Sequence, residues 1–164
     1  MDYLRWGVLG ASKFALEHLT PAIQLAKNNR FKALASGSKE KAAAFVELEP
    51  EIELYESYDE LLADDGVDAV YIPLPNTMHV DWTIRAIKSG KHVLCEKPVA
   101  MRAEEINELI KLRDDTGLLV AEAYMIVHHP QWQKAREIVQ SDILGDLIQV
   151  DSVFSYNNQA DPEN

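Results

Sequence analysis

Two short stretches of the sequence carry side chains that could take part in a reaction, Leu74 to His79 and Cys95 to Ala100. In the second stretch, Lys97 stands between Glu96 and a proline that restricts the backbone. A lysine held in a cleft can donate a proton or a hydrogen bond to a carbonyl oxygen while a hydride reaches the carbonyl carbon. The alternative is a solvated Lys97 that pairs with Glu96, and without a motif that alternative is favoured.

A third stretch, Gly7 to Ala15, has the composition of a phosphate-binding turn. Small residues let the backbone approach a pyrophosphate, and the start of the following helix offers N–H groups and a positive potential. The match to the G-x-G-x-x-G fingerprint is imperfect, because Gly10 fits while Ser12 and Ala15 stand where glycines are usual. A glycine that only turns the chain is the alternative. The position of the stretch at the first strand of an alternating chain favours binding.

The end of the second expected strand indicates which dinucleotide would bind. An acidic residue is expected there to bond the ribose 2′-hydroxyl of NAD. Residues Ala35 to Lys39 contain no carboxylate, but they do contain two hydroxyls, a glycine and an ammonium group, which suit a 2′-phosphate. We therefore expect NADP, with NAD less favoured. Ser38 also fits as the N-cap of the next helix, a role that does not exclude binding.

The elements that would position these residues alternate between short apolar runs and segments of helical period. We expect strands at 4–9, 31–36, 52–55, 68–73, 92–95 and 118–121, and helices at 14–26, 39–48, 59–63, 77–89 and 104–116. Pro21 should kink or break the first helix, with Thr20 capping its continuation. The expected fold class is α/β, a doubly wound parallel Rossmann sheet whose strand carboxyl ends line a ligand crevice.

After residue 122 the pattern changes. A helix is expected at 131–141, followed by an alternating strand at 147–156, which fits an antiparallel sheet open on one side. We expect residues 1–122 to form the NAD(P)-binding Rossmann domain. Residues 123–164 would begin a truncated C-terminal α+β domain with an open-faced antiparallel sheet. The polar residues 157–164 should fray.

Composition and charge indicate which classes of partner and which cellular location to expect. A net charge of −11 with no basic tract argues against nucleic acid. The N-terminus lacks a signal pattern, and the longest apolar run, 117–127, is too short to span a bilayer. The single cysteine, Cys95, cannot form an internal disulfide, so a cytoplasmic location is expected. His128 and His129 lack further ligands at a useful spacing, so no metal site is expected.

The sequence resembles the Gfo/Idh/MocA oxidoreductases, the family of glucose-fructose oxidoreductase, inositol dehydrogenase and rhizopine-catabolism proteins. The resemblance covers essentially the whole chain and is carried by Tyr71 to Asn76, His79, Ser89 to Pro98, Glu122 to Met125, His129–Pro130 and Leu144–Gly145. Residues 5–11 and 35–38 are most similar to the NADP-using branch that contains dihydrodiol dehydrogenase.

The resemblance implies hydride transfer between NADP and a secondary alcohol or carbonyl of a sugar, cyclitol or dihydrodiol. Lys97 would be the catalytic proton donor or hydrogen-bond electrophile, with Glu96 beside it, and the Lys97–Pro98 peptide would be cis. Carried over position by position, the cofactor-binding residues are Gly10, Ala11, Ser12, Phe14, Ser36, Gly37, Ser38, Lys39, Leu74, Pro75, Asn76, His79, Glu96 and Lys97.

The chain departs from the family in two respects. Relatives often carry an aromatic residue and an arginine where this chain has Ile126 and Val127, so the family's substrate contacts are not assigned there. Family members also continue into a second domain that supports subunit association and supplies a tyrosine or histidine and an aspartate. We therefore expect a homo-oligomer when full length, and little or no turnover by the 164-residue chain alone. A non-catalytic regulatory protein of the same fold is the alternative, and Lys97 argues for the enzyme.

Overall fold

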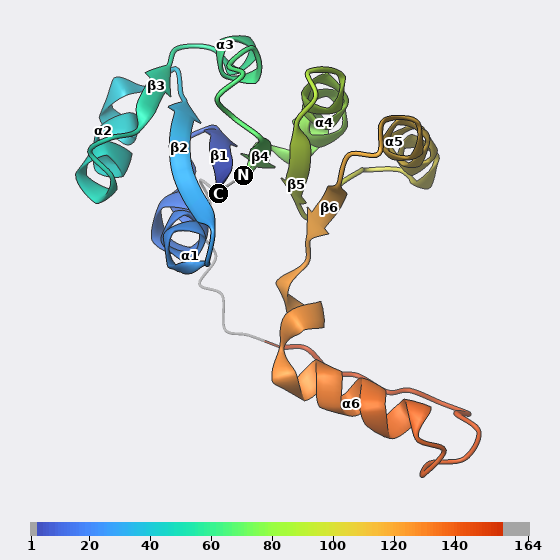
Figure 1. Cartoon of the computed structure of the whole chain (residues 1–164). Helices are drawn as coiled ribbons and strands as arrows, with labels where there is room; N and C mark the ends of the chain where they lie inside the picture. The colour runs from blue at the N-terminus through green and yellow to red at the C-terminus, as the bar shows by residue number, and fades with distance from the viewer. Residues whose placement is uncertain (1–2, 156–164) are drawn as a thin grey trace. The chain divides into compact units, whose positions relative to one another are not determined.

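The computed structural model describes residues 3–155, which fall into two compact units that divide after Tyr124. The first unit holds a six-stranded sheet with helices on its two faces (Figure 1). The described part of the second unit holds a short 3₁₀ segment and one α-helix. Within residues 3–155, no helix combines the length and the apolar character needed to cross a membrane.

The sheet of the first unit is parallel throughout and has the strand order β3-β2-β1-β4-β5-β6. Its order reverses between β1 and β4, the topological switch point where doubly wound sheets bind ligands. The expected α/β Rossmann fold is confirmed. The strands are β1 (Leu4–Leu9), β2 (Asn29–Ala35), β3 (Glu53–Tyr55), β4 (Ala69–Ile72), β5 (His92–Glu96) and β6 (Val120–Ala123).

The helices follow the expected segments closely. They are η1 (Ala15–Leu19), α1 (Thr20–Leu25), α2 (Lys39–Leu48), α3 (Tyr58–Leu62), η2 (Asn76–Met78), α4 (His79–Lys88) and α5 (Ala103–Thr116). Ser57 and Glu60 form a capping box that starts α3. Gly117 ends α5 with a φ of 69°, a left-handed conformation that costs glycine little.

Of the kink or break expected at Pro21, the break does not form, because a π turn, η1, runs directly into α1. The backbone N–H and the hydroxyl of Thr20 both donate to the Ala15 carbonyl, which closes a five-residue turn over η1. Pro21 then lies in the first turn of α1, where its missing N–H is tolerated. The expectation that Thr20 caps the continuation is wrong, because its hydroxyl is used within the helix.

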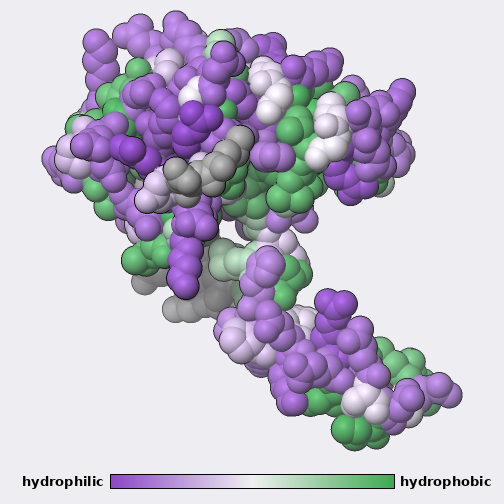
Figure 2. All heavy atoms as spheres, viewed as in Figure 1, coloured by the Kyte–Doolittle hydropathy of each residue, from purple (hydrophilic) through white to green (hydrophobic). Residues whose placement is uncertain are grey.

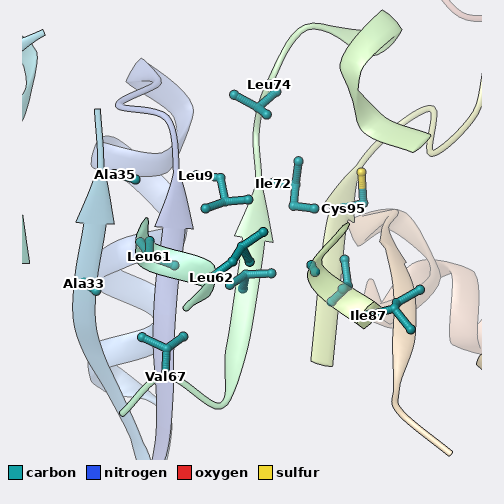
Figure 3. Close-up of a cluster of buried hydrophobic side chains, with 13 residues drawn as sticks. Leu9, Ala33, Ala35, Leu61, Leu62, Val67, Ile72, Leu74, Ile87 and Cys95 are labelled. Carbon is teal, nitrogen blue, oxygen red and sulfur yellow. The ribbon is translucent and has the colours of Figure 1, made fainter. Parts of the chain in front are cut away.

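Two apolar clusters lie on opposite faces of the sheet because neighbouring strand residues point in opposite directions. Leu9 belongs to the cluster under α3 and α4, whereas Val8 belongs to the cluster under η1, α1 and α2. Figure 3 shows the first cluster, in which Leu61 packs over the strands. A Cβ on Gly7 would lie 2.6 Å from a methyl carbon of Leu61, so the absence of a side chain there lets α3 approach β1.

Arg5 and Asp68 join the starts of β1 and β4. The Asp68 carboxylate accepts from the backbone N–H of Arg5 at 2.9 Å and from its Nε and Nη2 at 2.8 and 2.7 Å. The side-chain bonds from Arg5 are the main reason that the pKa of Asp68 lies below its usual value. Because the folded-state pKa is lowered, this stabilisation is present above the unfolded-state pKa of about 3.9 and is lost as pH falls through the folded value.

Asp68→Asn is expected to lower the free energy of unfolding by about 1–3 kcal/mol near neutral pH, because Arg5 loses its charged acceptor. The difference from the natural chain should shrink as pH falls below about 3.9 and through the lowered folded-state pKa, since the natural carboxyl then becomes protonated. Urea unfolding over this pH range measures both effects. Asp114→Asn is the control, because Asp114 pairs with Arg113 at an exposed site and should contribute less than about 0.5 kcal/mol. Equal losses in the two variants would contradict the account.

The second unit contains η3 (Met125–His128) and α6 (Pro130–Gln140) in its described part. The expected helix at 131–141 is confirmed within a residue, and Nδ1 of His129 caps it by accepting from Gln131 N–H at 3.2 Å. Many apolar side chains of this unit are exposed, and hydrophobic residues lie on its surface in Figure 2. The exposed side chains include Trp132, Ile148 and Val153.

The expected strand at 147–156 is not formed. Residues 147–155 carry no strand, and residue 156 lies outside the described residues, as does the expected fraying segment 157–164. Alternating residues define the two faces of a strand, but a strand also needs a neighbour to bond its backbone groups. No other strand lies within residues 125–155 to serve as that neighbour. The described part of this unit therefore shows no antiparallel sheet.

Candidate functional site

Three loops leave the carboxyl ends of β1, β4 and β5, which are adjacent strands of the sheet. They begin at Gly10, Pro73 and Lys97 respectively. The loops after β1 and β4 flank the switch point, so the fold places both beside the crevice that a ligand would enter. Of the residues expected to bind or react, these loops contain Gly10, Ala11, Ser12, Leu74, Pro75 and Lys97.

Gly10 brings the loops after β1 and β4 together. Its φ is 103°, and its N–H donates to the Ala35 carbonyl at 2.9 Å. A Cβ at this position would lie 2.9 Å from Cδ2 of Leu74. The conformation and the close approach both favour glycine, as expected from its place in the turn.

The residues that follow Gly10 start a helix. The hydroxyl of Ser12 accepts from the N–H of Ala15 at 3.1 Å, and its own N–H donates to the Gly10 carbonyl at 3.0 Å. Ala11 packs against the cluster under α1, while Phe14 is 38% exposed. The turn thus leads from the strand directly into the first turn of a helix, the arrangement that offers N–H groups to an anion.

The end of β2 forms a compact turn of hydroxyl groups. Ser36 Oγ accepts from the Ser38 N–H at 3.1 Å and donates to the Ser38 carbonyl at 3.2 Å. The hydroxyl of Ser38 accepts from Lys41 N–H at 3.3 Å, which confirms Ser38 as the N-cap of α2. A Cβ on Gly37 would meet no atom within 4 Å, so the space beside this turn is open.

A pocket of about 570 Å³ lies between α2 and β3, beside this turn. Ser36 and Lys39 are among its lining residues, so a hydroxyl-bearing and an ammonium-bearing side chain border the same pocket. The pocket is lined by Ser36, Lys39, Ala42, Ala43, Val46, Glu47, Leu54, Tyr55 and Glu56. The structure therefore brings together two of the three side chains that the sequence assigned to an adenosine phosphate, whereas the third, Ser38, is not among the lining residues.

The loop after β4 exposes Pro75 and Asn76 but encloses His79. The His79 side chain is fully buried, with Nδ1 2.7 Å from the Pro98 carbonyl oxygen and Nε2 2.7 Å from the Leu74 carbonyl oxygen. Sequence reasoning grouped His79 with residues on the nicotinamide side. In the structure both of its ring nitrogens are engaged by main-chain oxygens.

The loop after β5 presents the side chain of Lys97 to solvent. Glu96 is held by Tyr71, whose hydroxyl donates to Oε1 at 2.7 Å, and by the backbone N–H of Lys97, which donates to Oε2 at 3.2 Å. Among the described residues, the Lys97 ammonium group makes no hydrogen bond or ion pair. The Lys97–Glu96 ion pair, which was the alternative to a catalytic Lys97, is therefore not formed. The Lys97–Pro98 peptide is cis, as the resemblance implied.

Two residues that support this loop were not assigned a role from the sequence. Tyr71 is fully buried, and burial followed by the bond to Glu96 raises the pKa of its phenol far above the usual value, so it stays a donor. Glu122, next to last in β6, accepts from the N–H of Val99 at 2.9 Å. A tyrosine within an otherwise aliphatic buried strand and a carboxylate at a strand end are the signals that could have pointed to them.

Cys95 does not contribute a reactive group. Its side chain is fully buried, and burial is the main reason that the pKa of the thiol is raised to about 12. Cys95 is therefore a buried small residue of the core. Within residues 3–155, no three His, Cys, Asp or Glu side chains gather as metal ligands would.

A parallel sheet with its order reversed between β1 and β4, and a glycine turn into a helix at that point, defines a dinucleotide-binding Rossmann domain. Comparison with known families agrees, because residues 4–124 match the family described as "Oxidoreductase family, NAD-binding Rossmann fold". The chain belongs to this Gfo/Idh/MocA oxidoreductase family.

The relatives include sugar oxidoreductases, an uncharacterized oxidoreductase and a trans-1,2-dihydrobenzene-1,2-diol dehydrogenase of Xenopus tropicalis. The chain is 44% identical to uncharacterized oxidoreductase ORF334 of Rhizobium meliloti, over 96% of this chain and 47% of that protein. It is 39% identical to a D-xylose 1-dehydrogenase (NADP(+)) of Haloferax volcanii, over 93% of this chain and 46% of that protein. A crystal structure of a 3-ketoreductase variant from Actinomadura kijaniata with TDP-benzene and NADP matches with a TM-score of 0.81 and 34% identity. The match covers 88% of this chain and 44% of that one. The chain thus spans about half the length of these relatives.

Proposed function

We propose that this chain is the NADP-binding half of an oxidoreductase that transfers a hydride between nicotinamide and a secondary alcohol or carbonyl of a sugar, cyclitol or dihydrodiol. The observation that carries the proposal is Lys97, an exposed amine without a side-chain partner among residues 3–155, in a loop that is otherwise held by hydrogen bonds. The named sugar dehydrogenase and ketoreductase among the relatives support the sugar class.

The chemistry of the donor set fits NADP. The turn at Gly10, with Ala11, Ser12 and Phe14, would receive the pyrophosphate, because backbone N–H groups and a helix start meet there. Ser36, Gly37, Ser38 and Lys39 would receive the 2′-phosphate through hydroxyl, backbone and ammonium donors. Leu74, Pro75 and Asn76 would lie on the nicotinamide side, and His79 would act through the loops that it joins.

Bound NADPH supplies the hydride in the reducing direction. Lys97 would donate a hydrogen bond or proton from Nζ to the substrate carbonyl oxygen, which gains negative charge as the hydride arrives. Glu96 would stay in place beside it because the Tyr71 hydroxyl and the Lys97 backbone N–H hold both carboxylate oxygens. In the oxidising direction the same amine would accept the proton from the alcohol.

A test of the proposal uses the whole protein with NADP and NADPH against sugars, cyclitols and dihydrodiols. We expect turnover of at least one member of the panel, followed by absorbance of the reduced nicotinamide. NADP binding without any oxidation or reduction would contradict the enzyme and favour a regulatory dinucleotide-binding protein of the same fold.

Gly10→Ala is expected to weaken NADPH binding by about tenfold or more, because the new methyl group would force Leu74 and the turn apart. The positive φ should also cost about 1–3 kcal/mol of stability. Gly117→Ala is a matched control, since Gly117 has a φ of 69° but a Cβ there would meet no atom within 4 Å. Calorimetric titration with NADPH and urea unfolding separate the two effects. Equal losses of binding in both variants would show that the contact with Leu74 is irrelevant.

The domain organisation is part of the same proposal. Residues 1–122 would form the dinucleotide-binding domain, and residues 123–164 would begin a second domain that completes the substrate site and supports a homo-oligomer. The division of the described residues after Tyr124 and the twofold length of the relatives support this arrangement. A cytoplasmic location is also proposed and rests on the single, buried cysteine.

A further inference from the structure

His79, the first residue of α4, is buried between two loops of the candidate site. One ring nitrogen lies 2.7 Å from the carbonyl oxygen of Leu74, in the loop after β4. The other lies 2.7 Å from the carbonyl oxygen of Pro98, which directly follows Lys97. The ring therefore joins the loop on the proposed nicotinamide side to the loop that carries the proposed proton donor.

The two partners of His79 are both hydrogen-bond acceptors. A carbonyl oxygen only accepts hydrogen bonds, whereas a neutral imidazole has one N–H. In either neutral tautomer, one nitrogen would point a lone pair at an oxygen 2.7 Å away, which is repulsive. Only the imidazolium ion, with a proton on each nitrogen, makes both contacts hydrogen bonds. Charge-assisted bonds are also shorter and stronger than neutral ones.

We propose that His79 is a positioning residue, which as an imidazolium ion fixes the Lys97 loop against the loop after β4. The consequence for turnover rests on the proposed function, whereas the bridge between the loops does not. The ring is 0% exposed, so it would act on the reaction only through these loops.

Two features of the surroundings oppose a charged ring. Burial removes its water, and the N-terminal end of a helix disfavours a cation. The two carbonyl oxygens compensate by solvating both N–H groups. The first unit uses the same arrangement elsewhere, because the buried ammonium group of Lys91 donates to the carbonyls of Asp64 and Val67 at 2.7 and 2.8 Å.

The bridge matters because, in the part of the chain that the structure describes, the other hydrogen bonds of the Lys97 loop do not reach the loop after β4. Val99 N–H is tied to Glu122 in β6, and Lys97 N–H is tied to Glu96 in β5. Loss of the His79 bonds would leave the carbonyls of Leu74 and Pro98 without this shared partner. A displacement of a reacting group by about 1 Å can lower a rate by about 100-fold.

The charge state is tested by ¹⁵N NMR of the chain with labelled histidine at neutral pH. We expect both ring nitrogens of His79 to carry a proton. His92 is the internal comparison, because its Nδ1 accepts from Leu119 N–H at 2.9 Å and must lack one. An unprotonated nitrogen in the His79 ring would overturn the imidazolium assignment, and this measurement needs no variant.

The bridge is tested by His79→Gln, with Thr83→Val as a control at a fully buried site one turn further along α4. Backbone amide exchange at Met78 and Val99, one in each loop region, should rise by about tenfold or more in His79→Gln only. In the whole protein, kcat should fall by about 10- to 100-fold, and the Kd for NADPH should rise by a smaller factor, because only the loop after β4 among its expected contacts is loosened. Unaltered exchange in both loops, or equal effects of the two variants, would overturn the proposal. If the natural whole protein turns over no substrate, the proposed function is wrong. The amide-exchange comparison still tests whether His79 joins the two loops.

Discussion

Lys97→Met in the whole protein should lower kcat by about 10²- to 10⁴-fold, the range that a positioned general acid or base contributes. Methionine has a similar length but no N–H donor, so the substrate oxygen would lose its partner as the hydride arrives. NADPH should still bind, because most of its expected contacts lie at the ends of β1 and β2. Steady-state kinetics and a separate NADPH titration measure the two quantities.

Lys111→Met is the matched control for this variant. Lys111 lies exposed on α5, away from the three loops of the candidate site. We expect its kcat to equal that of the natural protein. Unchanged turnover in Lys97→Met would remove Lys97 from the reaction, and a loss of NADPH binding equal to the loss of kcat would assign it to binding alone.

Ser36→Asp is expected to reverse the preference for NADP. A carboxylate at this turn would repel the 2′-phosphate, and it could accept a hydrogen bond from the 2′-hydroxyl of NAD. The loss of a favourable charge-assisted bond is about 1.5–3 kcal/mol, so NADPH should bind about 10- to 100-fold more weakly. NADH should bind more tightly than it does to the natural chain. Titration calorimetry with both reduced cofactors measures the change.

Lys39→Gln separates the contribution of the ammonium group to NADPH binding from that of the hydroxyl groups beside the same pocket. NADPH affinity should fall and NADH affinity should stay the same, because only the 2′-phosphate needs the cation. Lys41→Gln, two residues further along α2 and absent from the pocket lining, is the control with no expected change. Equal losses of NADPH and NADH affinity in Lys39→Gln would mean that Lys39 contacts a part of the dinucleotide other than the 2′-phosphate.

Much of the first unit could be predicted because its signals are local. Strand β4 is a continuous apolar run, buried at every residue, as a strand covered on both faces must be. Gly117 marked the end of α5, and Ser38 marked the start of α2. The candidate site followed from these elements, since parallel strands bring the ends of β1, β4 and β5 to one edge.

The parts that could not be predicted depend on partners distant in sequence. The alternation of 147–156 says which residues could share a face, but a strand forms only where another strand can pair with it. The burial of His79 between two carbonyls could not be read from its neighbours, since Pro98 lies 19 residues away. Glu122 was similarly seen as part of a motif and not as the acceptor of Val99 N–H.

The central claim is that the crevice at the ends of β1 and β4, with the turn at Ser36, binds NADP in preference to NAD. The most direct test is calorimetric titration of the natural 164-residue chain with NADPH and with NADH at physiological salt. The account predicts saturable binding of one NADPH per chain, at least about tenfold tighter than NADH. Tighter binding of NADH, or binding of neither cofactor, would contradict it.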